Sequence, residues 1–241
     1  MNTQFKEIKA YMESHMQLNQ KKILSTKSGT LDVIGVSMKD IRALGKKLKV
    51  NHELALTLYE TSTYEYLMLG ALIADDKKIN DETSKDWVIK AQSTAIVDQG
   101  LSALFMQLDK RHQMIKSFIE DTNVHIRYAG YALLSSYFRG EDLETLDLEL
   151  GKFALDAIKD TLSNEPLSIQ NAMNNAVVMA GLHVPQLVKR AKDVADYIGY
   201  VMPLVARNQC NIQSASDYLV RYSTQPKFSR VARLREQNNS S

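Results

Sequence analysis

The sequence predicts an all-α protein in which helix pairs stack as a solenoid, and three observations support this fold class. The 241 residues include only four prolines and ten glycines, and residues that favour helices are abundant. β-branched residues rarely alternate with polar ones, as they would in half-buried strands. Apolar or small residues recur with helical spacing in five segments, whose starting points are 28 to 43 residues apart.

Each of the five segments carries apolar or small residues at positions i, i+3, i+4, i+7 and i+8, and we call these sets stripes. The stripes are Tyr66, Leu69, Gly70, Ile73, Ala74; Val97, Gly100, Leu101, Leu104, Phe105; Ile126, Ala129, Gly130, Leu133, Leu134; Ile169, Ala172, Met173, Ala176, Val177; and Tyr197, Tyr200, Val201, Leu204, Val205. Their small residues would let neighbouring helices approach closely. An unrepeated helical bundle is the alternative architecture.

Between the stripes, three segments carry signals for the start of a helix. Ser37 precedes "MKDIRALGKKL" with Asp40 three residues later, which resembles a capping box. Thr83 and Asp86 repeat this pattern before "WVIKA", and Asn123 can cap the helix that follows it. These signals predict partner helices for the stripes.

The remaining segments are assigned by composition. The acidic stretch "GEDLETLDLELGKFALDAIKD" (140–160) is expected to be helical, whereas "QLNQKKILSTKSGT" (17–30) lacks a period and is predicted to be a loop or frayed helix. The tail "EQNNSS" (236–241) is predicted to be disordered. Because no linker rich in Pro, Gly or Ser divides the rest, residues 1–235 are predicted to form a single helical-repeat domain.

Composition excludes several classes of protein and site. The net charge is +2, and the single cysteine, Cys210, excludes an internal disulfide and a cysteine-based metal cluster. The polar N-terminus is no secretory signal, and no apolar run approaches a membrane span, so a soluble, cytoplasmic protein is expected. Glycine-rich phosphate loops, serine elbows and HExxH spacing are missing from the sequence, and the five histidines are scattered. We therefore expect no metal and no cofactor.

Asp98 and Arg127 occupy equivalent positions in two consecutive stripes. Each directly follows the first residue of its stripe, so stacking in phase would place the two side chains on one surface. They could then simply form an ion pair. An aspartate near the start of a helix is also favoured by the helix dipole, which is a second purely structural explanation.

Basic residues recur at several levels of the predicted solenoid. The strongest candidates for contacts to a nucleic-acid backbone are Arg42, Lys46, Lys47, Lys110 and Arg111, with Arg127. Further basic residues lie in "VKRAK" and in "VRYSTQPKFSRVARLR" near the C-terminus. A curved positive surface would suit the phosphates of DNA, although lysine and arginine are also ordinary on exposed helix faces.

Four motifs in this order and spacing resemble the AlkD-type HEAT-like repeat DNA glycosylases, the DNA alkylation repair enzyme family. They are "VIGVSMKDIRALGKKL", "AIVDQGL", "NVHIRYAGYALL" and "SIQNAMNNAVV", and the resemblance spans roughly residues 5–222. It implies an α-helical superhelix whose concave face holds duplex DNA through its phosphates. It also implies excision of N3- or N7-alkylated purines, with Asp98 as the catalytic aspartate that stabilises the oxocarbenium-like sugar. Arg127 matches the arginine that lies beside the lesion and contacts the backbone.

The sequence departs from this family at three elements of the site. Two tryptophans wall the family's cleft, but Thr94 and Asn175 occupy the corresponding positions here. The only tryptophan, Trp87, comes too early in the chain and is expected in the core. The family's minor-groove helix falls in residues 17–30, where no good helix is predicted.

Three functions follow from this combination. The favoured one is a monomeric HEAT-like protein that binds the backbone of duplex DNA, with weak or no alkylpurine glycosylase activity. The first alternative is an active glycosylase that uses Asp98 in a cleft built differently. The second alternative is a helical-repeat scaffold that binds another protein.

Overall fold

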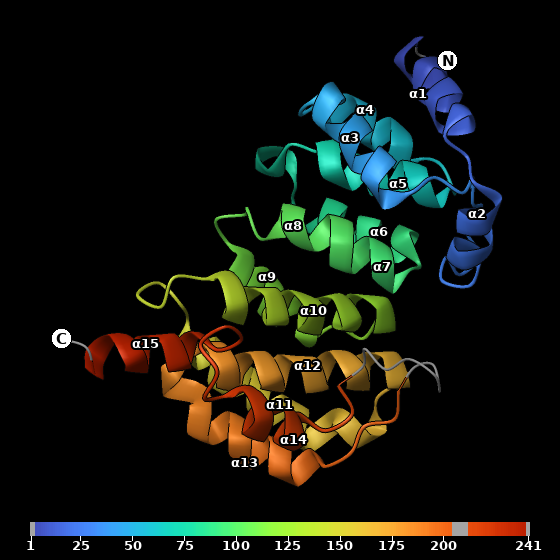
Figure 1. Ribbon diagram of the computed structural model, residues 1–241. Coiled ribbons are helices and arrows are strands. Elements are labelled where there is room, and N and C mark those ends of the chain that lie inside the picture. The colour runs from blue at the N-terminus through green and yellow to red at the C-terminus, as the bar shows by residue number, and fades with distance from the viewer. Residues whose placement is uncertain (1–2, 204–211, 240–241) are drawn as a thin grey trace. The chain divides into compact units, whose positions relative to one another are not determined.

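The computed structural model describes residues 3–203 and 212–239, and these residues form helices joined by short connections (Figure 1). The described residues contain no β-strand, only isolated bridges that pair Asp32 with Thr63 and Tyr200 with Ser214. The all-α prediction is therefore confirmed. The chain divides into two compact units, Met1–Arg111 and His112–Ser241, here called the N-terminal and the C-terminal unit.

The N-terminal unit is built around one almost completely buried helix. Its elements are α1 (Thr3–Ser14), α2 (Leu18–Ser25), α3 (Met38–Leu48), α4 (His52–Tyr59), α5 (Tyr64–Ile73), η1 (Asp76–Lys78), α6 (Asp81–Ala91), α7 (Thr94–Ile96), η2 (Val97–Leu101) and α8 (Ser102–Phe105). Helix α5 packs against α3, α4 and η2 and buries nearly all of its side chains. Trp87 is buried and stacks on Tyr59 with ring centroids 3.7 Å apart, as expected for a core tryptophan.

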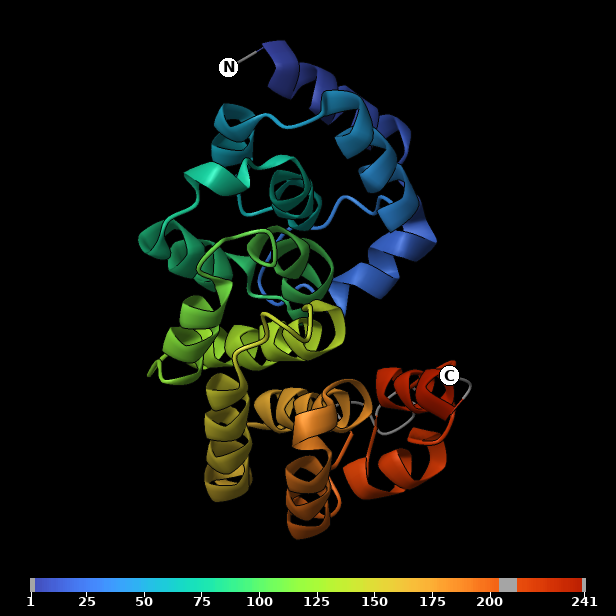
Figure 2. The ribbon, with the colours of Figure 1, turned by 90° about the vertical axis from the view of Figure 1, so that its left-hand side faces the viewer.

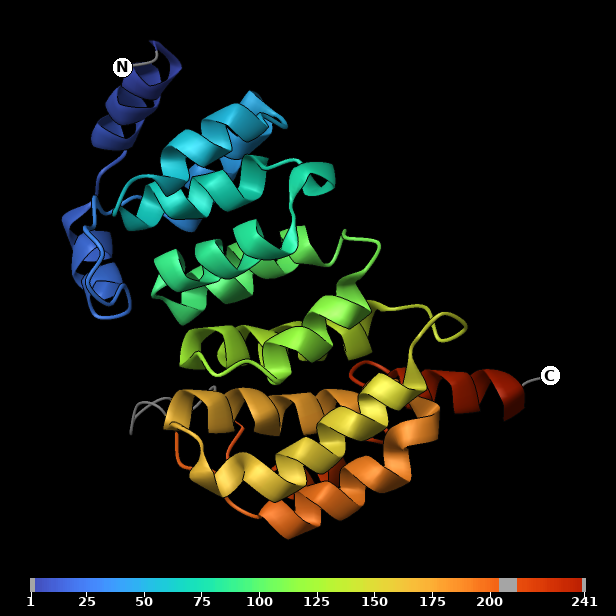
Figure 3. The same ribbon diagram turned by 180° about the vertical axis from the view of Figure 1, so that it is seen from behind.

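The C-terminal unit is built around α12. Its elements are α9 (Arg111–Ile119, whose first residue closes the N-terminal unit), α10 (Val124–Gly140), α11 (Leu148–Thr161), η3 (Leu162–Asn164), α12 (Leu167–His183), η4 (Pro185–Leu187), α13 (Val188–Ile198), α14 (Ala215–Tyr222) and α15 (Arg230–Asn239). Helices α10 and α12 lie side by side (Figure 3). Helices α14 and α15 lie together against α12, as Figure 2 shows in red beside orange.

The first four stripes are confirmed, because all of their residues are buried in the core. The fifth is wrong. Helix α13 ends at Ile198, Gly199 turns the chain with a φ of 63°, and Tyr197 and Tyr200 are 67% and 59% exposed. Leu204 and Val205 of this stripe, and Cys210, lie outside the described residues. The prediction failed because the hydrophobic spacing continues past Gly199, which terminates the helix.

Glycines allow close helix contacts in both units, as the stripes predict. A β-carbon on Gly70 would lie 2.8 Å from the ring of Tyr59, and one on Gly100 would lie 3.0 Å from the β-carbon of Ala71. In the C-terminal unit, a β-carbon on Gly130 of α10 would lie 2.8 Å from the backbone nitrogen of Ile119. A backbone atom cannot move aside as the end of a side chain can, so Gly130 is the most restrictive of the three.

We expect Gly130→Ala to lower the free energy of unfolding by about 2 kcal/mol, because α9 and α10 must separate to admit the methyl group. Gly140→Ala on the same helix is the matched control, since nothing lies within 4 Å of the β-carbon it would add. Chemical denaturation of both variants measures the difference. Equal stabilities for the two variants would contradict the close contact.

The helix starts agree with the sequence in two of three cases. Ser37 caps α3 by accepting a hydrogen bond from the Asp40 N–H at 3.2 Å, and Asn123 caps α10 through the His125 N–H at 2.9 Å. The assignment of Thr83 as a cap is wrong, because Asn80 accepts the Thr83 N–H at 2.7 Å and α6 begins three residues earlier.

Residues 17–30 and the C-terminal tail contain more helix than their composition predicts, whereas the acidic stretch 140–160 contains less. Residues 18–25 form α2, so the prediction of a loop or frayed helix there is wrong for these eight residues, although none of them is buried. Helix α15 continues to Asn239, where a disordered tail is predicted from residue 236. Helix α11 begins only at Leu148, after its cap Asp147.

Candidate nucleic-acid interface

Asp98 lies on a π-helical turn within a run that is helical from Thr94 to Phe105. The Ser102 N–H donates to the carbonyl of Val97, five residues back, which defines this wider turn. Val97, Gly100 and Leu101 are buried, and the close fit of Gly100 presses this side of the turn against α5. The Asp98 side chain is left exposed on the other side. π-Turns inside α-helices are frequent at functional sites, and periodicity in the sequence does not reveal them.

The start of the Asp98 helix is tied to the segment that follows α2. The buried Ser93 hydroxyl donates to the Lys27 carbonyl at 2.8 Å, and the Thr30 hydroxyl donates to the side-chain carbonyl of Gln92. Gln92 adopts a left-handed φ of 47° at the end of α6. The N-terminal segment therefore lies beside the Asp98 helix, although more than 60 residues separate the two in sequence.

A buried carboxylate fixes the connection between α2 and α3. Glu65 of α5 is fully buried and accepts the N–H groups of Ile34, Gly35 and Val36 at 3.0, 2.7 and 3.2 Å. The Gly35 carbonyl in turn accepts the Gln17 N–H at 2.9 Å, at the start of α2. Three charge-assisted hydrogen bonds thus hold the chain that orients both helices. Glu65 could not be singled out from the sequence, because its position within an apolar helix shows neither its burial nor its partners.

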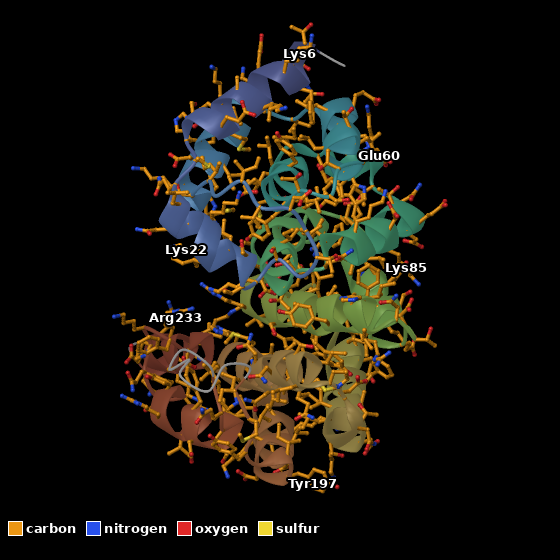
Figure 4. The ribbon with its side chains drawn as sticks, turned by 90° about the vertical axis from the view of Figure 1, so that its right-hand side faces the viewer. Lys6, Lys22, Glu60, Lys85, Tyr197 and Arg233 are labelled. Atoms are coloured by element: carbon orange, nitrogen blue, oxygen red, sulfur yellow. The ribbon has the colours of Figure 1, made fainter. Side chains whose placement is uncertain are left out.

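Helices α2 and α3 present basic side chains to solvent. Arg42, Lys46 and Lys47 of α3 are exposed, and no carboxylate of the described residues lies within ion-pair distance of them. Lys21 and Lys22 of α2 are also exposed, and Figure 4 shows Lys22 at the surface of this unit. Cations without protein partners keep their full charge for an external anion.

Lys110 and Arg111 precede and begin α9. Lys110 is exposed, whereas Arg111 is half-buried and donates through Nη1 to the Leu108 carbonyl at 3.0 Å. Their role in binding DNA stays a prediction.

Arg127 pairs with Glu165 of the C-terminal unit. Its Nε and Nη2 each donate to one carboxylate oxygen of Glu165 at 2.9 Å, and its Nη1 donates to the carbonyls of Asp121 and Thr122 at 3.0 and 2.7 Å. The hydrogen bonds to Glu165 raise the pKa of Arg127. The guanidinium is thus committed to protein partners in this structure.

The expected relation between Asp98 and Arg127 concerns two different units. Asp98 belongs to the N-terminal unit and Arg127 to the C-terminal unit, and the prediction that they share a surface stays a prediction. Sequence spacing suggested Asp98 as a possible ion-pair partner for Arg127. Glu165, which the sequence did not single out, makes the bidentate pair.

Neither position that corresponds to a tryptophan wall carries an aromatic ring. Thr94 is exposed at the start of the Asp98 helix, and Asn175 is half-buried on α12. The neighbouring Asn174 is buried and donates to the Ile212 carbonyl at 2.7 Å, so this part of α12 serves partly to hold the chain that follows α13.

His183, the last residue of α12, is buried in its neutral form. Burial and the nearby charges of Arg230, Arg139 and Arg233 lower its pKa from 6.5 to about 4. Its Nδ1 atom is buried with no hydrogen-bond partner among the described residues.

Acid is therefore expected to destabilise the protein through His183. Between pH 6.5 and about pH 4 the unfolded state binds a proton that the folded state rejects, so the free energy of unfolding falls as the pH falls and is unaffected above this window. The loss is on the order of 3 kcal/mol at the acid end. Urea denaturation at neutral and acid pH should show a smaller loss for His183→Gln than for the wild type. Parallel pH dependences for the two proteins would rule out this linkage.

The described part of the chain contains no group of three His, Cys, Asp or Glu side chains placed to hold a metal ion. Among the same residues, no helix is both long and apolar enough to cross a membrane.

Comparison with known proteins places these features in a family. The family model for "DNA alkylation repair enzyme" matches residues 2–208. Uncharacterized proteins of Listeria monocytogenes serovar 1/2a and Listeria innocua serovar 6a are similar, with 25% identity over 194 residues and 23% over 193 residues. Each match covers 79% of this chain and 83% of the relative.

A solved structure is similar over nearly the whole chain. It is described as "a new family of proteins related to the HEAT-like repeat DNA glycosylases with affinity for branched DNA structures". The TM-score is 0.84 at 20% sequence identity, and the match covers 94% of this chain and 97% of that one. The fold is therefore the HEAT-like repeat fold of these proteins. Together with the match of the family model over residues 2–208, this shows that the chain belongs to the DNA alkylation repair enzyme family.

Proposed function

We propose that this protein binds DNA through the phosphate backbone, as a monomer, and that it has weak or no alkylpurine glycosylase activity. The observation that carries the proposal is the set of exposed, unpaired cations on α3, Arg42, Lys46 and Lys47. They lie on a helix whose start is fixed by Ser37 and by the buried Glu65. A rigid helix that presents several cations suits the regularly spaced charges of a nucleic-acid backbone.

The residues at the positions of the family's site support a low rate of alkylpurine excision. Thr94 and Asn175 offer no aromatic face to pack against a deoxyribose, and Arg127 is engaged by Glu165 and two carbonyls. A carboxylate stabilises a developing positive charge most strongly where water is excluded. Asp98 is exposed on its helix, and Thr94, four residues earlier in the same helical run, is exposed as well.

The affinity reported for the structurally similar protein suggests the form of DNA. That protein is described as having affinity for branched DNA structures. Branched DNA brings several backbones together, so a protein that binds phosphates without reading bases should bind it at least as well as plain duplex.

An active glycosylase is the second candidate, and the π-turn favours it. Asp98 is the family's catalytic aspartate by resemblance, and the π-turn places it within a local distortion of the kind that often marks functional sites. An N3- or N7-alkylated purine is cationic and leaves readily, so a single carboxylate could provide some rate enhancement.

Two assays on the full chain separate these functions. We expect gel-shift binding of a four-way junction and of plain duplex, with affinity that falls steeply as salt is added. We expect release of methylated purines from methylated duplex to stay near the spontaneous rate. Rapid release that Asp98→Asn abolishes would replace the proposal with the glycosylase. A lack of any DNA binding at low salt would favour a protein-binding scaffold.

A further inference from the structure

The C-terminal unit contains a cavity of about 370 Å³ that is lined by residues of α10, α12, α14 and α15 and of the segment between α14 and α15. Three of its side chains are cationic and two are aromatic, and His183 forms part of its wall; these residues are Arg139, Lys227, Arg233, Tyr218, Phe228 and His183. Two apolar side chains of α12 complete the lining, which includes no carboxylate among the described residues. Figure 4 labels Arg233 on α15.

The cations of the cavity are available to a ligand. Among the described residues, the head groups of Arg139 and Lys227 have no hydrogen-bond or ion-pair partner. Arg233 uses Nη1 to donate to the Pro226 carbonyl at 2.7 Å, which orients the guanidinium and leaves its other N–H groups unused. A fourth cation, Arg230, lies outside the lining. It donates to the carbonyls of Phe138 and Glu141 at the end of α10.

The cations around the cavity repel one another. Burial and the charge of Arg233 lower the pKa of Arg230, and the same group of arginines contributes to keeping His183 neutral. An anion in the cavity would relieve this repulsion.

The aromatic wall is built into the fold. Phe228 packs on Tyr222 with centroids 4.7 Å apart, and Tyr222 packs on Tyr218 at 4.4 Å, while the Lys227 Nζ lies 5.3 Å from the centroid of the Phe228 ring. The fully buried Ser229 donates to the Leu182 carbonyl at 2.9 Å and caps α15 through the Ala232 N–H at 3.1 Å. This anchor fixes the segment that carries Lys227 and Phe228. Phe228 nevertheless stays 37% exposed, so part of its ring can meet a ligand.

We propose that this cavity binds a single nucleotide, with its phosphate on the Arg139, Lys227 and Arg233 cations and its base against Phe228 and Tyr218. Arginine and lysine recognise phosphate by charge-assisted hydrogen bonds, and aromatic faces bind bases by stacking. The volume lies at the lower end of the roughly 300–1,000 Å³ typical of ligand sites, which suits one nucleotide. The nucleotide is either free or the phosphorylated end of a DNA strand. This site does not depend on the backbone-binding surface of α3.

Calorimetric titration of the full chain tests the proposal with fragments of the ligand. We expect deoxyadenosine 5′-monophosphate to bind at least tenfold more tightly than either inorganic phosphate or deoxyadenosine, because only the nucleotide can contact both the cations and the aromatic rings. A single-stranded oligonucleotide with a 5′-phosphate, compared with the same strand bearing a 5′-hydroxyl, distinguishes a strand end from a free nucleotide. Tighter binding of the 5′-phosphate strand than of the 5′-hydroxyl strand would identify the strand end as the ligand, and equal binding of the two strands would identify the free nucleotide.

Matched variants locate the binding. Arg233→Gln and Lys227→Gln should each weaken mononucleotide binding at least tenfold, whereas Arg235→Gln, an exposed arginine of the same helix outside the cavity, should change it less than twofold. Phe228→Leu should weaken mononucleotide binding but leave phosphate binding unchanged. The proposal is overturned if the mononucleotide does not bind, if it binds no better than phosphate, or if the cavity variants and Arg235→Gln behave alike.

Discussion

Replacement of Arg42, Lys46 and Lys47 together by glutamine is expected to weaken binding to duplex DNA about a hundredfold at roughly 0.1 M salt. Each cation that contacts a phosphate releases about one counterion, so the slope of log affinity against log salt should become shallower by about 3. Because phosphate contacts carry no sequence information, the loss should be similar for different duplexes. Fluorescence anisotropy of labelled duplex over a series of salt concentrations measures both quantities.

A triple variant of equal charge provides the control. Lys152, Lys189 and Lys192 are exposed in the C-terminal unit, but each has a carboxylate partner 2.7 to 3.1 Å away. Their replacement by glutamine removes the same formal charge while α3 stays intact, and affinity should fall only a few-fold. If both triple variants lose affinity equally, the net charge of the chain governs binding and α3 is not the interface.

Arg127→Ala is expected to lower the free energy of unfolding by about 3 kcal/mol. The Arg127 and Glu165 side chains are only 20% and 11% exposed, so the substitution leaves a carboxylate desolvated without its bidentate partner. The carbonyls of Asp121 and Thr122, at the turn before α10, lose their donor as well. Urea denaturation measures the loss.

The Arg190–Asp156 pair supplies the control for this effect. It is also bidentate, but its side chains are 42% and 51% exposed, so Arg190→Ala should cost about 0.5 kcal/mol. Addition of Glu165→Gln to Arg127→Ala should restore part of the stability, because no buried carboxylate is then left unpaired. Similar losses for Arg127→Ala and Arg190→Ala would show that burial does not govern the Arg127 pair.

The Arg127 pair also bears on the function of this residue. By resemblance Arg127 contacts the DNA backbone, yet in this structure Glu165 and two carbonyls take four hydrogen bonds from it. If Arg127 acts mainly by holding the start of α10, Arg127→Ala should affect DNA affinity no more than its effect on folding explains. DNA binding measured under conditions in which both the wild type and the variant stay folded separates the effect on affinity from the effect on folding.

Some features of the candidate site followed from local sequence and others did not. The cap of α3 by Ser37 and the burial of Gly100 beside Asp98 could be predicted, because capping and helical periodicity involve residues at most a few positions apart. The π-turn at Asp98 changes the hydrogen-bond register without changing which residues are apolar, so the pattern did not reveal it. Helix α2 was missed because it buries no side chain and therefore leaves no periodic signal.

The sequence by itself determined the all-α class, four of the five buried stripes and the glycines at close helix contacts, because each depends on the spacing of residues within one helix. Only the tertiary structure decided that Glu165 pairs with Arg127, that Glu65 holds residues 34–36, and that the end of α12 meets Lys227 and Phe228 in a cavity. These partners are about 30 or more residues apart in the chain. Which residues become partners depends on how whole helices pack. The free energy of that packing is distributed over many residues, so no single position in the sequence reveals it.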